Sequence, residues 1–95
     1  MAAYLVADVE VLDAGAYEQY KQALPASLEP FGARYVVRGG AAEVLEGDWN
    51  PARLVIIEFP DMARLKAWYG SPAYRPLIAL RQRCARARLL AIEGA

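Results

Sequence analysis

The octapeptide WYGSPAYR, residues 68–75, places a helix end, a helix start and three aromatic side chains in one short segment. Gly70 suits the left-handed position that follows many helices. Ser71 supplies an N-cap side chain, and Pro72 has the backbone angle φ of a first helical turn. The segment therefore predicts two helices that meet at a sharp corner.

Regular elements are predicted on both sides of this corner. Residues 53–59 are mostly apolar and β-branched and are closed by Pro60, which is typical of a strand. Asp61 can cap a helix that runs to Tyr69, and Ser71 is expected to start another that runs to about residue 83. A last strand is predicted over residues 85–93.

The first half of the chain begins with a strand over residues 4–11, whose two faces are both largely apolar. Asp13 can cap a following helix, in which Pro25 is expected to cause a kink and which Pro30 with Gly32 should end. Its apolar stripe steps by three and four residues and comprises Tyr17, Tyr20, Leu24, Leu28 and Phe31. After it we expect a strand over residues 34–38, a turn at Gly39-Gly40, a return strand over 42–46 and a polar loop over 47–52.

This order of elements predicts an α+β fold, a ferredoxin-like sandwich in which helices cover one face of an antiparallel sheet. We expect one domain over residues 1–95, because the chain is too short for two cores. The second sheet face is too apolar to be left in water, so we expect a homodimer that stacks two such faces around a central space. The residues expected on that face are Tyr4, Val6, Val36, Leu54, Ile56, Leu90 and Ile92.

Composition excludes several classes of site. The chain has one cysteine and no histidine, so it can form neither an intramolecular disulfide nor a Ser-His-Asp triad or histidine-ligated metal site, and no metal or other cofactor is predicted. Equal numbers of basic and acidic residues, 11 of each, argue against nucleic-acid binding. The basic run at residues 81–88 is expected to be solvated and to pair with acids such as Asp8. No membrane segment or leader is predicted, which favours a cytoplasmic protein.

Three charged residues interrupt apolar strands and are the candidate catalytic residues: Asp8, Arg38 and Glu58. Strand alternation from Val6, Val36 and Ile56 places all three on the second sheet face. An arginine between two carboxylates can bind an anion or tune a carboxylate as a general base. The alternative is a structural ion pair that binds nothing.

Aromatic residues suggest where a small ligand would bind. The candidates are Tyr17, Tyr20, Trp68, Tyr69 and Tyr74 as an aromatic wall, with Ser71 beside them and Trp49 on the polar loop. Helical spacing of this kind is also typical of plain core packing. Trp49 is expected either to cover a pocket mouth or to reach a partner subunit.

Motifs along the whole chain resemble the DUF1330 family of proteins of unknown function, in the dimeric α/β-barrel superfamily. They are YLVAD at 4–8, YEQY at 17–20, RGG at 38–40, LEGDW at 45–49, EFP at 58–60 and WYGSPAY at 68–74. The resemblance implies the fold and dimerisation but no reaction, since the superfamily includes cofactor-independent monooxygenases, haem-degrading enzymes, lactone isomerases and ligand-binding regulators.

Two functions therefore remain open for the predicted pocket. One is cofactor-independent proton abstraction or oxygenation of a small acidic or aromatic substrate, with Asp8 or Glu58 as the base and Arg38 holding an anion. The other is a non-catalytic module that binds a small organic anion or has only a structural role as a dimer.

Overall fold

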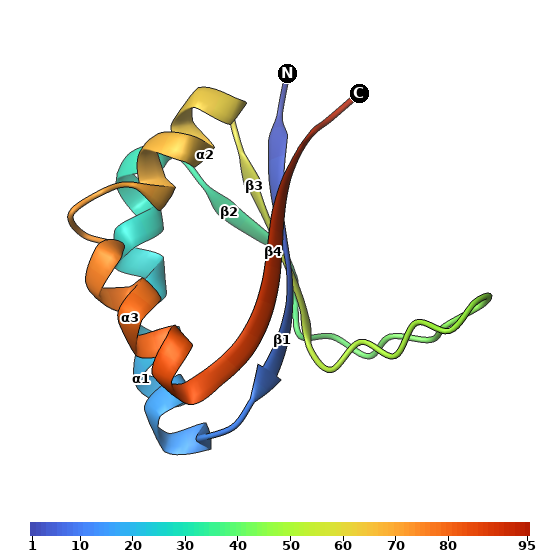
Figure 1. Ribbon diagram of the computed structural model, residues 1–95. Coiled ribbons are helices and arrows are strands. Elements are labelled where there is room, and N and C mark those ends of the chain that lie inside the picture. The colour runs from blue at the N-terminus through green and yellow to red at the C-terminus, as the bar shows by residue number, and fades with distance from the viewer.

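The computed structural model describes residues 1–95 and contains one sheet with helices on one of its faces (Figure 1). In chain order the elements are β1 (Ala3–Val11), α1 (Ala14–Leu28), the 3-10 turn η1 (Glu29–Phe31), β2 (Arg34–Arg38), β3 (Leu54–Phe59), α2 (Met62–Tyr69), α3 (Arg75–Cys84) and β4 (Ala85–Glu93). All strand pairs are antiparallel, in the order β2-β3-β1-β4. The predicted ferredoxin-like α+β sandwich is confirmed.

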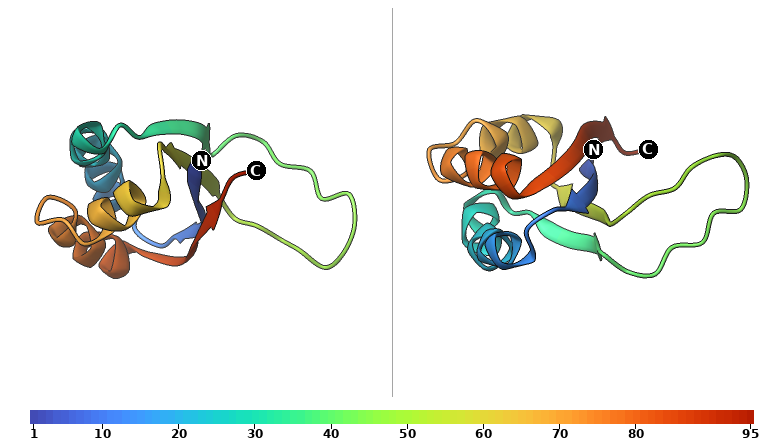
Figure 2. Two further views of the ribbon diagram at one scale, coloured as in Figure 1. Left: turned by 90° about the horizontal axis from the view of Figure 1, so that it is seen from above. Right: turned by 60° about the horizontal axis from the view of Figure 1, so that its bottom comes forward.

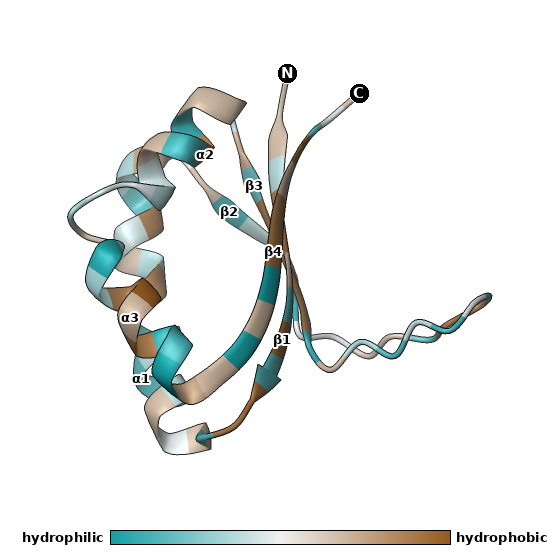
Figure 3. Cartoon of the chain, in the orientation of Figure 1, coloured by the Kyte–Doolittle hydropathy of each residue, from teal (hydrophilic) through white to brown (hydrophobic).

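Strand alternation divides the sheet into a core face and an outer face. Leu5, Ala7 and Val9 of β1 are buried against the helices, and so are Val55 and Ile57 of β3. Residues between them point to the face without helices, and hydrophobic and hydrophilic residues alternate along the first part of β4, so that its two faces differ (Figure 3). The sheet is therefore covered by this chain's own helices on one side only.

Side-chain caps start two helices as the sequence predicts. The Asp13 carboxylate accepts a hydrogen bond from the Ala16 amide at 3.2 Å, and the Asp61 carboxylate accepts one from the Arg64 amide at 2.8 Å. Each bond satisfies one of the free N–H groups in a first helical turn. Helix α1 continues through Pro25 to Leu28, and Gly32 takes the left-handed conformation at φ 68° that stops η1.

The corner at residues 68–75 differs from the prediction in detail. Gly70 has φ −93°, so it is not left-handed, and α3 begins at Arg75 rather than at Ser71. Ser71 still caps the turn between the helices, because its hydroxyl donates to the Trp68 carbonyl at 2.7 Å and accepts from the Tyr74 amide at 3.2 Å. The corner is thus fixed by a serine side chain and not by a special glycine conformation.

The predicted return strand at residues 42–46 is wrong. β2 pairs instead with β3, and residues 40–52, which we call the arm, form no backbone hydrogen bond with other backbone groups. The chain leaves β2 at Gly39, which has φ 70°. The Gly39 amide still donates a hydrogen bond to the Leu54 carbonyl of β3. The arm projects from the sheet away from the helices (Figures 1 and 2).

Replacing Ser71 should test how the corner is held. Ser71→Ala removes both hydroxyl contacts of a buried residue and should lower the free energy of unfolding by about 0.5–2 kcal/mol. Gly70→Ala should cost less, because Gly70 has a negative φ and a Cβ there meets only the Lys66 carbonyl at 3.7 Å. Denaturant unfolding measures both variants. A Gly70→Ala variant less stable than Ser71→Ala would contradict this account.

Candidate functional site

A bulge in β2 decides on which face Arg38 lies. Arg34 pairs with Glu58 and Tyr35 with Ile57, but Val37, not Val36, lies opposite Ile56. The extra residue reverses the alternation beyond it, since side chains alternate with a period of two. Arg38 consequently pairs with Val55 of the core face, and the expectation that it lies on the outer face is wrong.

Arg38 opens onto a pocket between the core face of the sheet and helices α1 and α3. We call it the basic pocket. The cavity measures about 30 Å³, room for roughly one or two water molecules. Its walls are mainly apolar, and its polar lining is contributed by Tyr17, Tyr20, Lys21, Tyr35, Arg38, Arg53 and Arg81.

The charges that line the basic pocket all have the same sign. Of its 14 lining residues four are basic, namely Lys21, Arg38, Arg53 and Arg81, and none is acidic. Arg81 is only 5% exposed and forms no salt bridge. Its Nε has no hydrogen-bond partner, and neither has the buried Nε of Arg53. A buried charge with no opposite charge beside it costs several kcal/mol, so this arrangement favours an anion.

Two of these arginines stand at the two ends of the arm. The Arg38 guanidinium lies over the Tyr35 ring, 4.5 Å from its centroid, and that of Arg53 lies 5.8 Å from the centroid of Tyr17. Arg53 also lies directly over Gly39, where any side chain would occupy the position of its guanidinium. Gly39 therefore provides both the turn out of β2 and the space for Arg53.

Hydroxyl groups complete the polar side of the pocket. The Tyr20 and Tyr74 hydroxyls are 2.7 Å apart and hydrogen-bonded, next to the Arg81 side chain. Burial, reinforced by the Tyr74 phenol, raises the pKa of Tyr20 well above its ordinary value of 10.0. Burial likewise raises the pKa of Tyr35. Both phenols are therefore neutral near pH 7 and can donate hydrogen bonds to a ligand.

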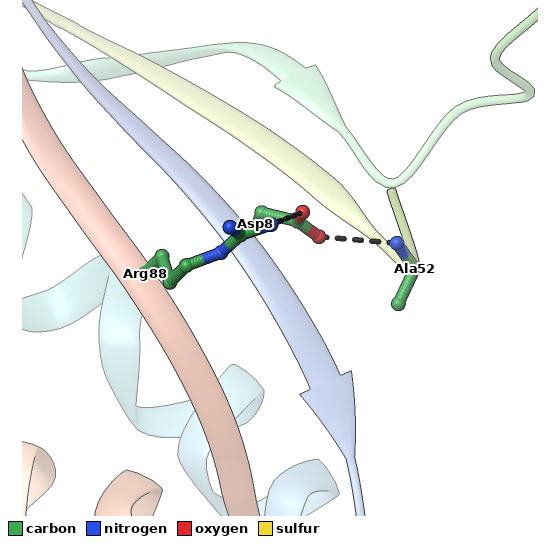
Figure 4. Close-up of polar contacts among 3 residues, drawn as sticks. All are labelled: Asp8, Ala52 and Arg88. Atoms are coloured by element: carbon green, nitrogen blue, oxygen red, sulfur yellow. Dashed lines mark hydrogen bonds and ion pairs between the residues drawn. The ribbon is translucent and has the colours of Figure 1, made fainter. Parts of the chain in front are cut away.

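The two candidate carboxylates lie on the opposite face of the sheet and are already paired. Asp8 accepts hydrogen bonds from Arg88 and from the Ala52 amide, each at 3.1 Å (Figure 4). Glu58 is paired with Arg34 at 2.6 Å. Because Glu58 lies opposite Tyr4, four residues from Asp8, the two carboxylates stand roughly 13 Å apart along the strands. The structure does not bring Asp8, Arg38 and Glu58 together.

The aromatic candidates occupy different environments. Trp68 and Tyr74 are fully buried with ring centroids 3.9 Å apart, and the Trp68 indole donates to Ser27 at 3.1 Å. Of the predicted aromatic wall, Tyr17 and Tyr20 line the basic pocket. Tyr69 is exposed, and Trp49 borders a hollow over the outer face. Ser71 serves as the cap of the corner.

Sequence reasoning missed the pocket residues Arg53 and Arg81. A signal for Arg81 exists: it follows Ile78 by three residues and precedes the buried Cys84 by three, so it lies on the apolar stripe of α3. A charged residue on an apolar helix face is unusual unless it has a buried function or partner. The predicted pairing of the basic run with acids is confirmed for Arg86 and Arg88 only.

Comparison with known proteins identifies the family. Residues 2–95 match the family described as a domain of unknown function, DUF1330. The chain belongs to the DUF1330 family. No curated protein matches this DUF1330 chain in sequence.

Solved structures share the fold of this DUF1330 protein. A protein of unknown function from Rhodopseudomonas palustris is similar with a TM-score of 0.79 and 22% identity, over 99% of this chain and 82% of that one. A dimeric ferredoxin-like protein of unknown function from Jannaschia sp. has a TM-score of 0.66 and 17% identity, over 99% and 100%. SnoaB, a cofactor-independent oxygenase from Streptomyces nogalater, has a TM-score of 0.68 and 10% identity, over 99% and 93%. None of the helices of the DUF1330 chain is long and apolar enough to cross a membrane.

The buried Tyr20 predicts a loss of stability at alkaline pH. Below pH 10 the phenol is protonated in both the folded and the unfolded chain. Above pH 10 the unfolded chain releases this proton while the folded chain keeps it, so the free energy of unfolding should fall as pH rises. Melting temperatures from pH 8 to 11 should decrease more steeply for the wild type than for Tyr20→Phe. Parallel curves would contradict the assignment.

Proposed function

We propose that this protein binds a small organic anion in the basic pocket and acts as a homodimer. The observation that carries the proposal is Arg81, a buried guanidinium with no carboxylate partner and an unsatisfied Nε. Arg38 and Arg53 from the sheet side lie around the same cavity. A bound carboxylate would supply the missing negative charge and accept charge-assisted hydrogen bonds from the guanidinium groups.

The walls of the pocket indicate the chemistry of the rest of the ligand. Apolar side chains such as Leu5, Leu24 and Ile57 line most of it, and the rings of Tyr17 and Tyr35 lie among them. An acid with a short apolar or aromatic body fits this combination better than a polar metabolite. The cavity has room for one or two water molecules, so binding such an acid requires lining side chains to move. Arg38 is exposed and is held by one ring contact.

The structure supports ligand binding better than it supports catalysis in which a candidate carboxylate acts as the base. Asp8 and Glu58 lie across the sheet from the pocket, and the pocket itself has cations to hold an anion but no carboxylate to accept a proton. The similarity in fold to a cofactor-independent oxygenase keeps oxygenation as the second candidate. In that case the arginines would stabilise the ionised substrate, and oxygen consumption with a panel of phenols and acids would detect it.

The outer face supports the homodimer. One row of apolar side chains, which we call the apolar row, crosses the four strands and consists of Leu90, Val6, Ile56 and Val37. The exposed Ile92 extends this surface on β4. A two-fold stack would bury the same row on both copies, as symmetric interfaces require. The dimeric ferredoxin-like protein from Jannaschia sp. is consistent with this arrangement.

A thermal-shift screen of aliphatic and aromatic acids tests the pocket. A ligand at a hundredfold excess over its dissociation constant should stabilise the wild type by about 2.7 kcal/mol. Arg81→Met should abolish this effect, whereas Arg86→Met should retain it, because Arg86 is exposed and pairs with Glu10 outside the pocket.

The melting temperature of Arg81→Met without a ligand distinguishes an anion-binding role of Arg81 from a structural one. Without a ligand, Arg81→Met should melt at or above the wild-type temperature, because it removes a buried charge that has no carboxylate partner. A much lower melting temperature would assign Arg81 to the structure instead. The proposal fails if no acid in a broad panel stabilises the wild type more than Arg81→Met.

Replacing a residue in the apolar row tests the dimer. Ile56→Asp places two uncompensated charges in one symmetric interface and should dissociate or unfold the protein. Leu12→Asp is the matched control, since Leu12 is an exposed leucine between β1 and α1. Light scattering gives the mass and circular dichroism the fold. A monomeric, folded wild type at micromolar concentration would rule out the dimer.

A further inference from the structure

The arm, residues 40–52, has no role in the fold of its own chain. Its only hydrogen bond to the body joins the Ala52 amide, at its end, to Asp8. Its remaining length extends away from the helices, beyond the outer face of the sheet (Figures 1 and 2). Ordering such a segment costs conformational entropy that contacts within this chain do not repay.

The arm carries apolar side chains that a free loop would not need. Leu45 is 86% exposed, Trp49 is 57% exposed, and Val44 is exposed as well. The tip of the arm is correspondingly hydrophobic in Figure 3. Trp49 borders the hollow above Val6 and Leu90, so this residue of the arm adjoins the apolar row of the outer face. Exposed apolar groups that adjoin one another mark a surface for association.

Charge distinguishes the arm from the rest of the chain. It contains Glu43, Glu46 and Asp48 and no basic residue, whereas the whole chain has 11 of each sign. The remainder therefore has 11 basic residues against 8 acidic ones. On the outer face Arg86 and Arg88 are paired yet remain 79% and 82% exposed. The arm thus carries three negative charges, and the rest of the chain carries an excess of three positive charges, so an arm and the body of a second copy attract each other.

We propose that the arm docks onto a second copy of this chain and clasps it, rather than lying free beside its own sheet. A copy stacked on the outer face occupies the space into which the arm projects, and two-fold symmetry makes the contact reciprocal. Leu45 and Trp49 then pack on the partner, and the three acids of the arm face a body that carries an excess of three positive charges. This inference rests on the proposed homodimer, but concerns a segment that the stacked sheets alone do not use.

Sedimentation velocity over a range of concentrations tests the clasp. Leu45→Asp and Trp49→Ala should each weaken the dimer at least about tenfold, as removal of central interface anchors does. Both variants should keep the wild-type circular dichroism, because the arm contributes no backbone pairing. Leu12→Asp should leave the dimer unchanged. Glu43→Gln combined with Glu46→Gln and Asp48→Asn should reduce the dependence of dimerisation on salt.

A photoreactive benzoylphenylalanine at position 45 provides an independent readout. It should produce covalent dimers on illumination, and the same group at position 12 should not. A dimeric wild type whose affinity is unaffected by the arm variants, or cross-links confined within one chain, would overturn the clasp and leave the stacked dimer intact. A monomeric wild type would overturn both.

Discussion

The pleat of a β-strand sends successive side chains to opposite faces of the sheet, and the chemistry of this protein depends on which face each charged residue takes. One extra residue in β2 reverses this order between Tyr35 and Val37. Arg38 consequently joins the core face, while Arg34 takes the outer face and pairs with Glu58. A single bulge thus separates the carboxylates from the arginine that the regular pattern would place beside them.

This separation gives the two faces different electrostatic characters. On the outer face, carboxylates and arginines pair with each other and remain partly hydrated, so each pair contributes little to stability. In the basic pocket, Arg81 is buried and Arg53 is half-buried, and the Nε of each lacks a hydrogen-bond partner. Buried polar groups in proteins nearly always have a hydrogen-bond partner. The two unpartnered Nε atoms are therefore the observation that indicates a ligand site.

The arm connects the pocket with the outer face. Arg38 and Arg53 flank it and line the pocket, Ala52 is bonded to Asp8 on the outer face, and Trp49 borders the apolar surface there. Gly39 makes this geometry compatible with the close approach of Arg53. A small domain whose sheet is covered on one side only thereby presents both an interior site and an exterior surface for association.

The sequence by itself determined the types of the helices and strands that form, although it also predicted a strand at residues 42–46 that does not exist. Local signals are strong in these elements, because alternation in β1 and β3 and the caps at Asp13 and Asp61 depend on neighbouring residues alone. The sequence also predicted that arginines of the basic run form ion pairs with acidic residues, as Arg86 and Arg88 do. Only the tertiary structure decided that β2 pairs with β3, where the bulge in β2 lies and which arginines line the cavity. Strand pairing and burial join residues far apart in the chain, and no local pattern records a one-residue shift in register.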